Sequence, residues 1–402
     1  MSTEPFEAWL RERSASPEWF WFIKRLAAND TLATHAHQAG PYLPNSVAFR
    51  LFPSINSPEI PNPDAYFPAI IDSHSLPRID VRLVWYNTRT RNECRITRWG
   101  GARSPLLDPE ATGSIAVFAF RKPSSQDADA DADADADACS VWICNLEEEE
   151  LLEGYVGAME PGTPLFLGSG LKPCSDAQIA RTPTCWLTPE TMPGEWRDRF
   201  PAGSEIVDRC VRLRPLDGLS ADTRLMSRRE CEYEMFRSIE KILVLPRVSR
   251  GFSTVDEFID YSNTVNNRRK SRSGRSLELH LARLFQEEGV AHSHGEVSEG
   301  AKKPDFLFPS AEHYRRGRSP VWMLAAKTTC KDRWRQILNE ADRIPVKHLA
   351  TLQEGVSRNQ YDEMKKAGVR MIVPAPLHKR YPKEIRPELL TVDQFISMVK
   401  PG

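Results

Sequence analysis

The sequence predicts a multidomain protein, with a β-rich N-terminal part followed by an α/β part whose central mixed sheet is flanked by helices. Up to about residue 170, short β-like runs alternate with Pro, Gly and Asn turns; beyond it, helix-period runs alternate with apolar strands. A stretch rich in Pro, Gly and Thr at 161–195 separates the two patterns and indicates a hinge. The length of 402 residues is compatible with two or three domains, at roughly 100–200 residues each.

The N-terminal part is expected to form a small barrel or sandwich with one or two helices. Its expected strands include four apolar runs, at 46–52, 81–89, 114–120 and 140–146. An Asp-Ala repeat at about 124–138 separates the last two, and its charge and small side chains predict a disordered surface loop. A neutral expansion is favoured over mimicry of DNA phosphates, because blocks of like charge are usually solvated.

The C-terminal part is expected to alternate helices with strands. Residues 276–289 place apolar side chains on one helical face and end at Gly289. The apolar run 321–329 is typical of a strand buried on both faces, and a second amphipathic helix is expected at 331–343. The remaining expected strands lie at 304–309, 348–353 and 368–375.

The net charge of −1 hides an uneven distribution of charge. Residues 1–184 carry 16 basic and 25 acidic side chains, whereas residues 185–402 carry 38 and 30. Eleven of the N-terminal acids lie in 124–153, so both parts are basic once that segment is set aside. A basic surface suggests an anionic partner such as nucleic acid, and compositional scatter explains it equally well.

The expected compartment is the cytoplasm. The N-terminus is charged, and no run approaches the ~18 apolar residues of a membrane span. The eight cysteines include no C-x-x-C pair, so neither a zinc ribbon nor a disulfide framework is expected.

One pair of residues suggests chemistry. Asp305 begins a short strand, and Lys327 ends an apolar strand where an unused ammonium would be costly to bury. If the two strands are neighbours, the pair meets at one edge of the sheet, as in metal-dependent phosphodiesterases. A carboxylate commonly lies two residues before such a lysine, but that position is Ala325; Glu340 and Glu278 are candidate replacements from helices.

Ordinary structural roles compete with this interpretation. An Asp at a strand start is often a turn residue, a Lys at a strand end commonly extends to solvent, and a helical Glu is usually solvated. The spacing alone favours these roles over a metal site.

The chain resembles the EcoRII-type restriction endonucleases of the PD-(D/E)XK nuclease superfamily in both halves. The resemblance is carried by NRRKSRSGRSLELHL, KKPDFLFPSA, AAKTTCKDRWRQILNEADRI and TLQEGVS, and nearer the N-terminus by IKRLAANDTLATHAHQAGPYLP, LFPSINSPE and TRNECRITRWGG. It implies an effector DNA-binding pseudobarrel domain at 1–173, a linker at 174–184 and a catalytic domain at 185–402.

The resemblance also implies Mg²⁺-dependent cleavage of double-stranded DNA at CCWGG-like sites, where W is A or T. Asp305, Lys327 and Glu340 match the family's active-site positions, with Asp305 and Glu340 as metal ligands, and Glu278 matches its helical glutamate. A homodimer, activation by a second DNA copy and a cognate cytosine methyltransferase in a bacterial cytoplasm are implied as well.

Three groups of residues are candidate DNA contacts in the catalytic part. Lys331, Asp332 and Arg333 match the family's reader of the outer C·G pairs, a pairing that the chemistry of these side chains permits; an N-cap Asp between two solvated cations is the alternative. The Arg- and Lys-rich tract 266–275 suits phosphate contacts or a solvated turn. Arg228, Arg229 and Tyr233 could cradle a flipped base, although such residues are also ordinary on a helix.

The effector domain is expected to contact DNA through residues that match the family, namely His37, Tyr42, Arg91, Glu93 and Arg95. Two departures from the family are present: the loop before Thr90 is shorter and lacks a lysine, and Cys94 replaces another lysine. Loss of two cations should weaken effector binding. A non-catalytic regulator on a nuclease scaffold, or a nuclease of another target such as CCNGG, are the alternatives.

Overall fold

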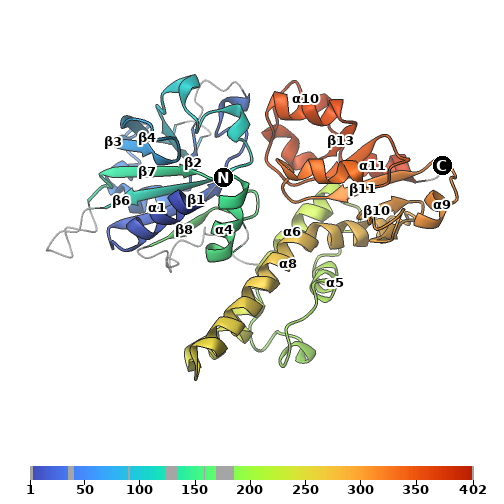
Figure 1. Ribbon diagram of the computed structural model, residues 1–402. Coiled ribbons are helices and arrows are strands. Elements are labelled where there is room, and N and C mark those ends of the chain that lie inside the picture. Colours follow the sequence, from blue (N-terminus) through green and yellow to red (C-terminus); the bar gives the residue numbers. More distant parts are fainter. Residues whose placement is uncertain are drawn as a thin grey trace. The chain divides into compact units, whose positions relative to one another are not determined.

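The computed structural model describes residues 3–34, 40–88, 91–122, 134–157, 159–168 and 185–400 (Figure 1). The chain divides into two compact units. The N-terminal unit holds Met1–Arg181 together with Gln353–Tyr361 and Lys379–Arg386, and the C-terminal unit holds Thr182–Leu352, Asp362–His378 and Pro387–Gly402.

The N-terminal unit is built on an eight-stranded mixed sheet of order β2-β5-β4-β3-β7-β6-β1-β8. The pairings are antiparallel except for that between β3 and β7. The strands are β1 (Trp19–Arg25), β2 (Tyr42–Leu43), β3 (Asp64–Ile71), β4 (Ile79–Tyr86), β5 (Glu93–Thr97), β6 (Ile115–Arg121), β7 (Ala138–Ile143) and β8 (Leu165–Leu167). The expectation of a β-rich N-terminal part is confirmed.

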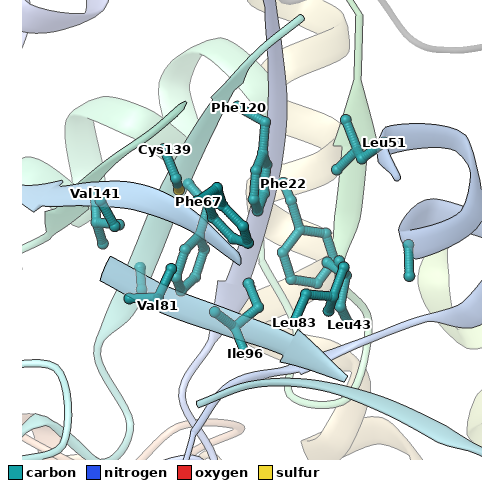
Figure 2. Close-up of a cluster of buried hydrophobic side chains, with 14 of the residues drawn as sticks. Phe22, Leu43, Leu51, Phe67, Val81, Leu83, Ile96, Phe120, Cys139 and Val141 are labelled. Atoms are coloured by element: carbon teal, nitrogen blue, oxygen red, sulfur yellow. The ribbon is translucent and has the colours of Figure 1, made fainter. Parts of the chain in front are cut away.

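Side chains on one face of this sheet form an apolar core. Figure 2 shows Phe22, Phe67 and Phe120 converging with Leu43 of β2 and Leu83 of β4. Strand alternation sends every second side chain to this face, and the apolar area it removes from water stabilises the sheet. Within the described parts of this unit, the α-helices beside the sheet are α1 (Glu4–Ser14), α2 (Asn45–Leu51) and α4 (Leu146–Val156).

Helix α2 corrects the strand expected at 46–52. Val47, Ala48 and Leu51 are buried on one side of the helix, which is a helical spacing within a run too short to be separated from a strand by pattern. Pro44 directly precedes the helix, at a position where its missing N–H costs nothing.

The acidic repeat lies partly outside the described residues, since 123–133 are not described. Its end is ordered, which corrects the expectation for 134–138. Asp137 accepts two hydrogen bonds from the Arg121 guanidinium, at 2.8 and 2.9 Å, and Asp135 accepts one from the Ser54 backbone at 3.1 Å. Ala136 between them is buried.

The C-terminal unit contains a five-stranded mixed sheet of order β13-β12-β11-β10-β9. Its strands are β9 (Ser293–His294), β10 (Phe306–Phe308), β11 (Trp322–Ala326), β12 (Lys347–Ala350) and β13 (Val369–Ile372). Strand β11 runs antiparallel to β10 and parallel to β12, so the sheet is mixed as expected. Four of the five β11 side chains are buried, as its apolar run predicts.

The two long helices α6 and α8 pack beside each other in this unit (Figure 1). The α-helices in this half of the chain are α5 (Gly203–Leu213), α6 (Ala221–Leu243), α7 (Leu245–Arg250), α8 (Val255–Glu287), α9 (Ala311–Arg315), α10 (Arg358–Lys366) and α11 (Val392–Val399). Helix α8 starts 21 residues before the expected start at 276, where the Thr254 hydroxyl accepts a hydrogen bond from the Glu257 backbone. No helix in the described ranges is both long and apolar enough to cross a membrane.

Cys185 and Cys231 form a disulfide, which corrects the expectation that the cysteines form none. They lie 46 residues apart in the sequence, so their spacing gave no signal. Packing brings them together: the Cys185 backbone donates to Glu234 at 2.8 Å, and the Leu187 backbone donates to the Ser238 hydroxyl at 3.0 Å, both on α6.

Candidate active site

Asp305 and Lys327 meet at one edge of the C-terminal sheet. Phe306 pairs with Leu324, so the antiparallel register places Asp305 opposite Ala325. Asp305 Oδ2 accepts a hydrogen bond from the Ala326 backbone at 2.7 Å and lies 3.2 Å from Lys327 Nζ. The expected meeting of the two side chains on neighbouring strands is therefore present, and each remains partly accessible at 18% and 23%.

Glu340 approaches this pair from a different element than expected. Instead of an α-helix over 331–343, the chain forms a 3₁₀-helix, η8 (Arg333–Asn339), and Glu340 follows it in extended conformation. Trp334 and Ile337 are three residues apart and both buried, a spacing that lines up one face of a 3₁₀-helix as well as an α-helix. Apolar periodicity therefore could not distinguish the two.

The electrostatics of Glu340 show that it lies close to the pair. Burial, followed by the negative charge of Asp305, raises the pKa of Glu340 to about 7, while Lys327 and Lys347 act in the opposite direction. Glu340 Oε2 is buried and has no hydrogen-bond partner among the described residues. A buried carboxylate oxygen without a partner is costly unless a cation or proton satisfies it.

These side chains fit a divalent cation. Two carboxylates repel each other here, one of them with an unsatisfied oxygen, and a positive ion between them removes both penalties. Mg²⁺ is commonly held by one or two carboxylates together with waters and phosphate oxygens. Among the described residues, no group of three or more His, Cys, Asp or Glu side chains is arranged to hold a metal.

Lys347 is a neighbour of this site that the sequence interpretation missed. Its Nζ donates hydrogen bonds to the backbone oxygens of Glu340 and, at 2.7 Å, of Ala341. The sequence does offer a signal like the one used for Lys327, a lysine next to an apolar strand. Lys347 directly precedes the expected strand 348–353.

Glu278 on α8 contacts a different partner. Its Oε1 lies 2.5 Å from His294 Nε2, and the His294 ring stacks on Phe306, the residue after Asp305. Among the interactions of the described residues, none joins Glu278 to Asp305, Lys327 or Glu340. The structure thus brings three of the four expected catalytic residues together and places the fourth beside His294.

The residues expected to recognise the outer base pairs lie directly before η8 and at its first position. Asp332 is exposed and occupies the N-cap position of η8 without a capping hydrogen bond, and Lys331 and Arg333 are half-buried. Asp332 Oδ1 lies 3.8 Å from Arg335 Nη1, and the Asp332 side chain is 46% exposed. The expected alternative, a side-chain N-cap, is not formed.

The arginines of α6 have structural partners. Arg228, which is 2% exposed, lies 2.7 Å from Glu287 and donates to the backbone oxygens of Arg214 and Pro215. Arg229 is buried and donates to the Ser276 hydroxyl at 2.6 Å. The structure therefore gives both arginines a packing role besides the base-binding role expected for them.

Part of the basic tract 266–275 is also internal. It lies within α8, so it is not the solvated turn considered as an alternative. Arg269 and Arg272 form paired hydrogen bonds with Glu240 and Glu232 of α6, and the Arg272 guanidinium lies 4.8 Å from the Tyr233 ring centroid. Lys270 and Arg275 are exposed.

In the N-terminal unit, four of the five expected effector residues are described. Tyr42 pairs with Arg95 across β2 and β5, and Glu93 lies 3.1 Å from Arg95. The Arg91 guanidinium lies 5.9 Å from the Tyr86 ring centroid. His37 lies outside the described residues.

Arg95 and Cys94 differ in their orientation on β5. Arg95 donates to the backbone oxygens of Asn29 and Gly40, at 3.2 and 3.0 Å. Cys94 is fully buried in the core. Cys94 therefore adds no charge to the surface of this unit, and the expected weakening of effector binding stays a prediction.

Comparisons with known proteins follow the same division of the chain. A family model described as EcoRII C terminal matches residues 236–396, and one described as restriction endonuclease EcoRII, N-terminal, matches 15–170. The chain is 44% identical to the type II restriction enzyme EcoRII of Escherichia coli over 402 residues, 98% of this chain and 96% of that protein. It is 24% identical to the type II restriction enzyme SsoII of Shigella sonnei over 146 residues, 34% of this chain and 47% of that protein.

Solved structures that match part of the chain include restriction endonuclease PspGI with substrate DNA, at a TM-score of 0.42 and 17% identity, covering 53% of this chain and 96% of that one. Metal-depleted Ecl18kI with uncleaved, modified DNA gives a TM-score of 0.44 and 18% identity, covering 52% and 83%. The near full-length match at 44% identity and the two family models decide the assignment. The chain therefore belongs to the EcoRII family and is a type II restriction endonuclease.

Proposed function

We propose that this endonuclease uses Mg²⁺ to hydrolyse both strands of DNA at CCWGG-like sites, as a homodimer, and that a second DNA copy bound by the N-terminal unit activates it. The observation that carries the catalytic part is the Asp305–Lys327 pair at 3.2 Å. Both residues shift the pKa of the Glu340 carboxyl, whose Oε2 has no hydrogen-bond partner among the described residues. Host DNA is protected by a cognate cytosine methyltransferase.

In the proposed mechanism, Asp305 and Glu340 hold the cation and Lys327 acts on the scissile phosphate. A bound Mg²⁺ supplies positive charge at the phosphate and lowers the pKa of a bound water. The Asp305 carboxylate is oriented by the Ala326 backbone N–H, so it reaches the site with little freedom left to lose. The Lys327 ammonium stabilises negative charge that develops on the phosphate oxygens and orients the attacking water.

We assign recognition of the DNA bases to the residues around the start of η8. Asp332 is the exposed acid of the set, and a carboxylate accepts from cytosine N4. Lys331 and Arg333 present donors that suit guanine O6 and N7. Together these side chains favour C·G pairs, as at the ends of CCWGG.

Substitution of the central pair tests the catalytic assignment. Asp305→Asn and Lys327→Met should each lower cleavage of a plasmid carrying CCWGG sites in Mg²⁺ by about 100-fold or more, because each removes a charge that the reaction needs. Binding to a short CCWGG duplex, measured by gel shift, should survive within about tenfold, since specificity resides at other residues.

Matched controls for these variants are Asp256→Asn and Lys383→Met, which remove the same charges at exposed positions. They should cleave as the parent does. Cleavage by Asp305→Asn at the rate of Asp256→Asn would overturn the assignment of the site, and unchanged cutting of a plasmid without CCWGG would overturn the assigned target.

A further inference from the structure

Lys347 is a buried lysine for which the proposed mechanism has no role. It begins β12, an inner strand of the C-terminal sheet, and is 5% exposed. Burial of an ammonium costs on the order of several kcal/mol unless its charge is paired and its N–H groups donate hydrogen bonds. Here they donate to two backbone oxygens, those of Glu340 and Ala341, with the Ala341 oxygen at 2.7 Å.

The two backbone oxygens belong to a sharp reversal of the chain. η8 ends at Asn339, Glu340 is extended, and Ala341 has a φ of +46°, a left-handed conformation that costs a non-glycine residue about 1 kcal/mol or more. Ala341 is fully buried, so packing holds it in place. The Glu340 N–H donates to the Ile337 oxygen at 3.1 Å, and the Ala341 oxygen also accepts a hydrogen bond from the Ile344 N–H at 2.9 Å. The Lys347 ammonium adds a donor to the carbonyls of both Glu340 and Ala341.

The reversal determines where the Glu340 carboxyl points. A side chain that leaves η8 within its last turn would follow the face of the helix, whereas the extended Glu340 departs from it and acts on Asp305 and Lys327. The carboxyl and the carbonyl of Glu340 belong to one residue, so fixing the carbonyl restricts the carboxyl. Lys347 thus contacts the backbone of the proposed metal ligand, and its ammonium is bound to carbonyl oxygens.

The surroundings of the reversal also bear charges of both signs. The Asp342 backbone donates to Glu299 at 2.9 Å, and the Asp342 carboxylate lies 2.5 Å from Lys302 Nζ. Burial lowers the pKa of Lys347, while the negative charges of Asp342, Glu299 and Glu340 oppose this shift. A neutral side chain of similar length at position 347 would remove this donor from the Glu340 carbonyl, whereas the Ala341 carbonyl would keep its hydrogen bond from the Ile344 backbone N–H at 2.9 Å.

We propose that Lys347 is a positioning residue for the Glu340 carboxyl: by holding the carbonyls of Glu340 and Ala341 it keeps that carboxyl at the Asp305–Lys327 pair and raises the affinity of the site for its divalent cation. This inference rests on the proposed function, in which Glu340 is a metal ligand. Partners that orient metal ligands commonly contribute 10–100-fold, roughly, to metal affinity.

The test is cation binding by the full-length protein with a saturating CCWGG duplex. Free Mn²⁺ is measured by electron paramagnetic resonance, which does not depend on cleavage. Lys347→Met should weaken Mn²⁺ binding about 10–100-fold. Lys365→Met, which removes an exposed lysine that pairs with Glu388, is the matched control and should leave binding unchanged.

Cleavage kinetics provide a second measurement. In Lys347→Met, kcat should fall while KM for DNA changes less than about threefold, and raising Mg²⁺ should restore part of kcat, because only the cation site is weakened. Lys347→Gln, whose amide still donates to a carbonyl, should lie between the parent and Lys347→Met. If Lys347→Met does not fold, the Gln variant decides by the same comparison.

The outcomes separate this inference from the proposed function. If Asp305→Asn binds Mn²⁺ as tightly as the parent, the proposed metal site fails and the inference fails with it. If Asp305→Asn loses Mn²⁺ but the folded Lys347 variants bind it as the parent does, the proposed function stands and the positioning role is refuted.

Discussion

At the scale of single residues, Glu340 links the fold to the chemistry. Burial first and the charge of Asp305 second raise the pKa of Glu340 to about 7. Near neutral pH, its protonated and ionised forms are therefore both populated when no cation is bound. Metal ligation requires the ionised carboxylate, so protons and divalent cations compete for this site.

This competition predicts a pH-dependent stability in EDTA. A carboxyl whose pKa is higher in the folded than in the unfolded protein favours folding below the unfolded value, near 4.5, and that contribution is lost as pH rises through about 7. Glu340→Gln removes the titration, so its Tm relative to the parent should increase between pH 5 and pH 8. Differential scanning calorimetry of both proteins measures the difference.

Two additions make this test specific. Glu384→Gln, an exposed acid, should show a constant Tm difference across the same range. Adding Mg²⁺ at pH 8 should raise the Tm of the parent more than that of Glu340→Gln, because the ligand binds the folded form with the carboxylate intact. A pH-independent difference between Glu340→Gln and the parent would contradict the burial of this charge.

The sequence predicted the proximity of Asp305 and Lys327, since strand ends and the cost of a buried lysine are local features. It could not predict the conformation that delivers Glu340. The 3₁₀ form of η8 and the left-handed Ala341 depend on tertiary contacts from Lys347 and on packing, neither of which is encoded in the spacing of apolar residues.

At the scale of elements, α6 and α8 are joined by ion pairs between buried or half-buried side chains. Glu232 and Arg272 are 2% and 8% exposed and form two hydrogen bonds, at 2.9 and 2.7 Å. Ser276 adds a third hydrogen bond to Glu232. Breaking one side of such a pair leaves a buried charge unpaired, which costs about 3–5 kcal/mol.

Arg272→Met should therefore lower the free energy of unfolding of the C-terminal unit by about 3 kcal/mol or more in urea titrations. The double variant Arg272→Met with Glu232→Leu should recover part of this loss, because neither member of the pair is then left as an unpaired buried charge. Lys270→Met on the exposed face of α8 is the control, with an expected change within about 0.5 kcal/mol. Equal effects of Arg272→Met and Lys270→Met would show that the ion pair is not buried in solution.

Elements with a strong apolar pattern were predicted well, and those without it were not. The buried face at Leu277, Leu281 and Leu284 and the core strand β11 have the expected burial. The first part of α8 was missed because its side chains are mostly polar and exposed, so capping by Thr254 and pairing with α6 replace a buried stripe there.

At the scale of the whole molecule, the proposed activation by DNA assigns different tasks to the two units. A substrate with one CCWGG site should be cut slowly, and a short CCWGG duplex should accelerate its cleavage, whereas a substrate with several sites should need no addition. Cleavage time courses on matched plasmids measure this. Equal rates on all substrates would refute activation by a second copy.

A substitution at Arg91 tests binding of the activating DNA by the N-terminal unit separately from cleavage. Arg91→Ala should weaken binding of the activating duplex and lower the slope of log K against log salt by about 1, as expected for one lost phosphate contact. Cleavage of a multi-site plasmid at low salt should be less affected. An unchanged salt slope would exclude Arg91 from the DNA contacts.

The anchoring of the Asp-Ala repeat has a practical consequence. Arg121 and Asp137 bind each other at the ends of β6 and β7, so the two ends of the insertion are held together whatever its length. For a loop closed in this way, doubling the number of residues costs only about 0.6 kcal/mol. A fluorescent protein or affinity tag grafted between these anchors should leave both β-strands paired, giving an internal attachment point for single-molecule work on the intact enzyme.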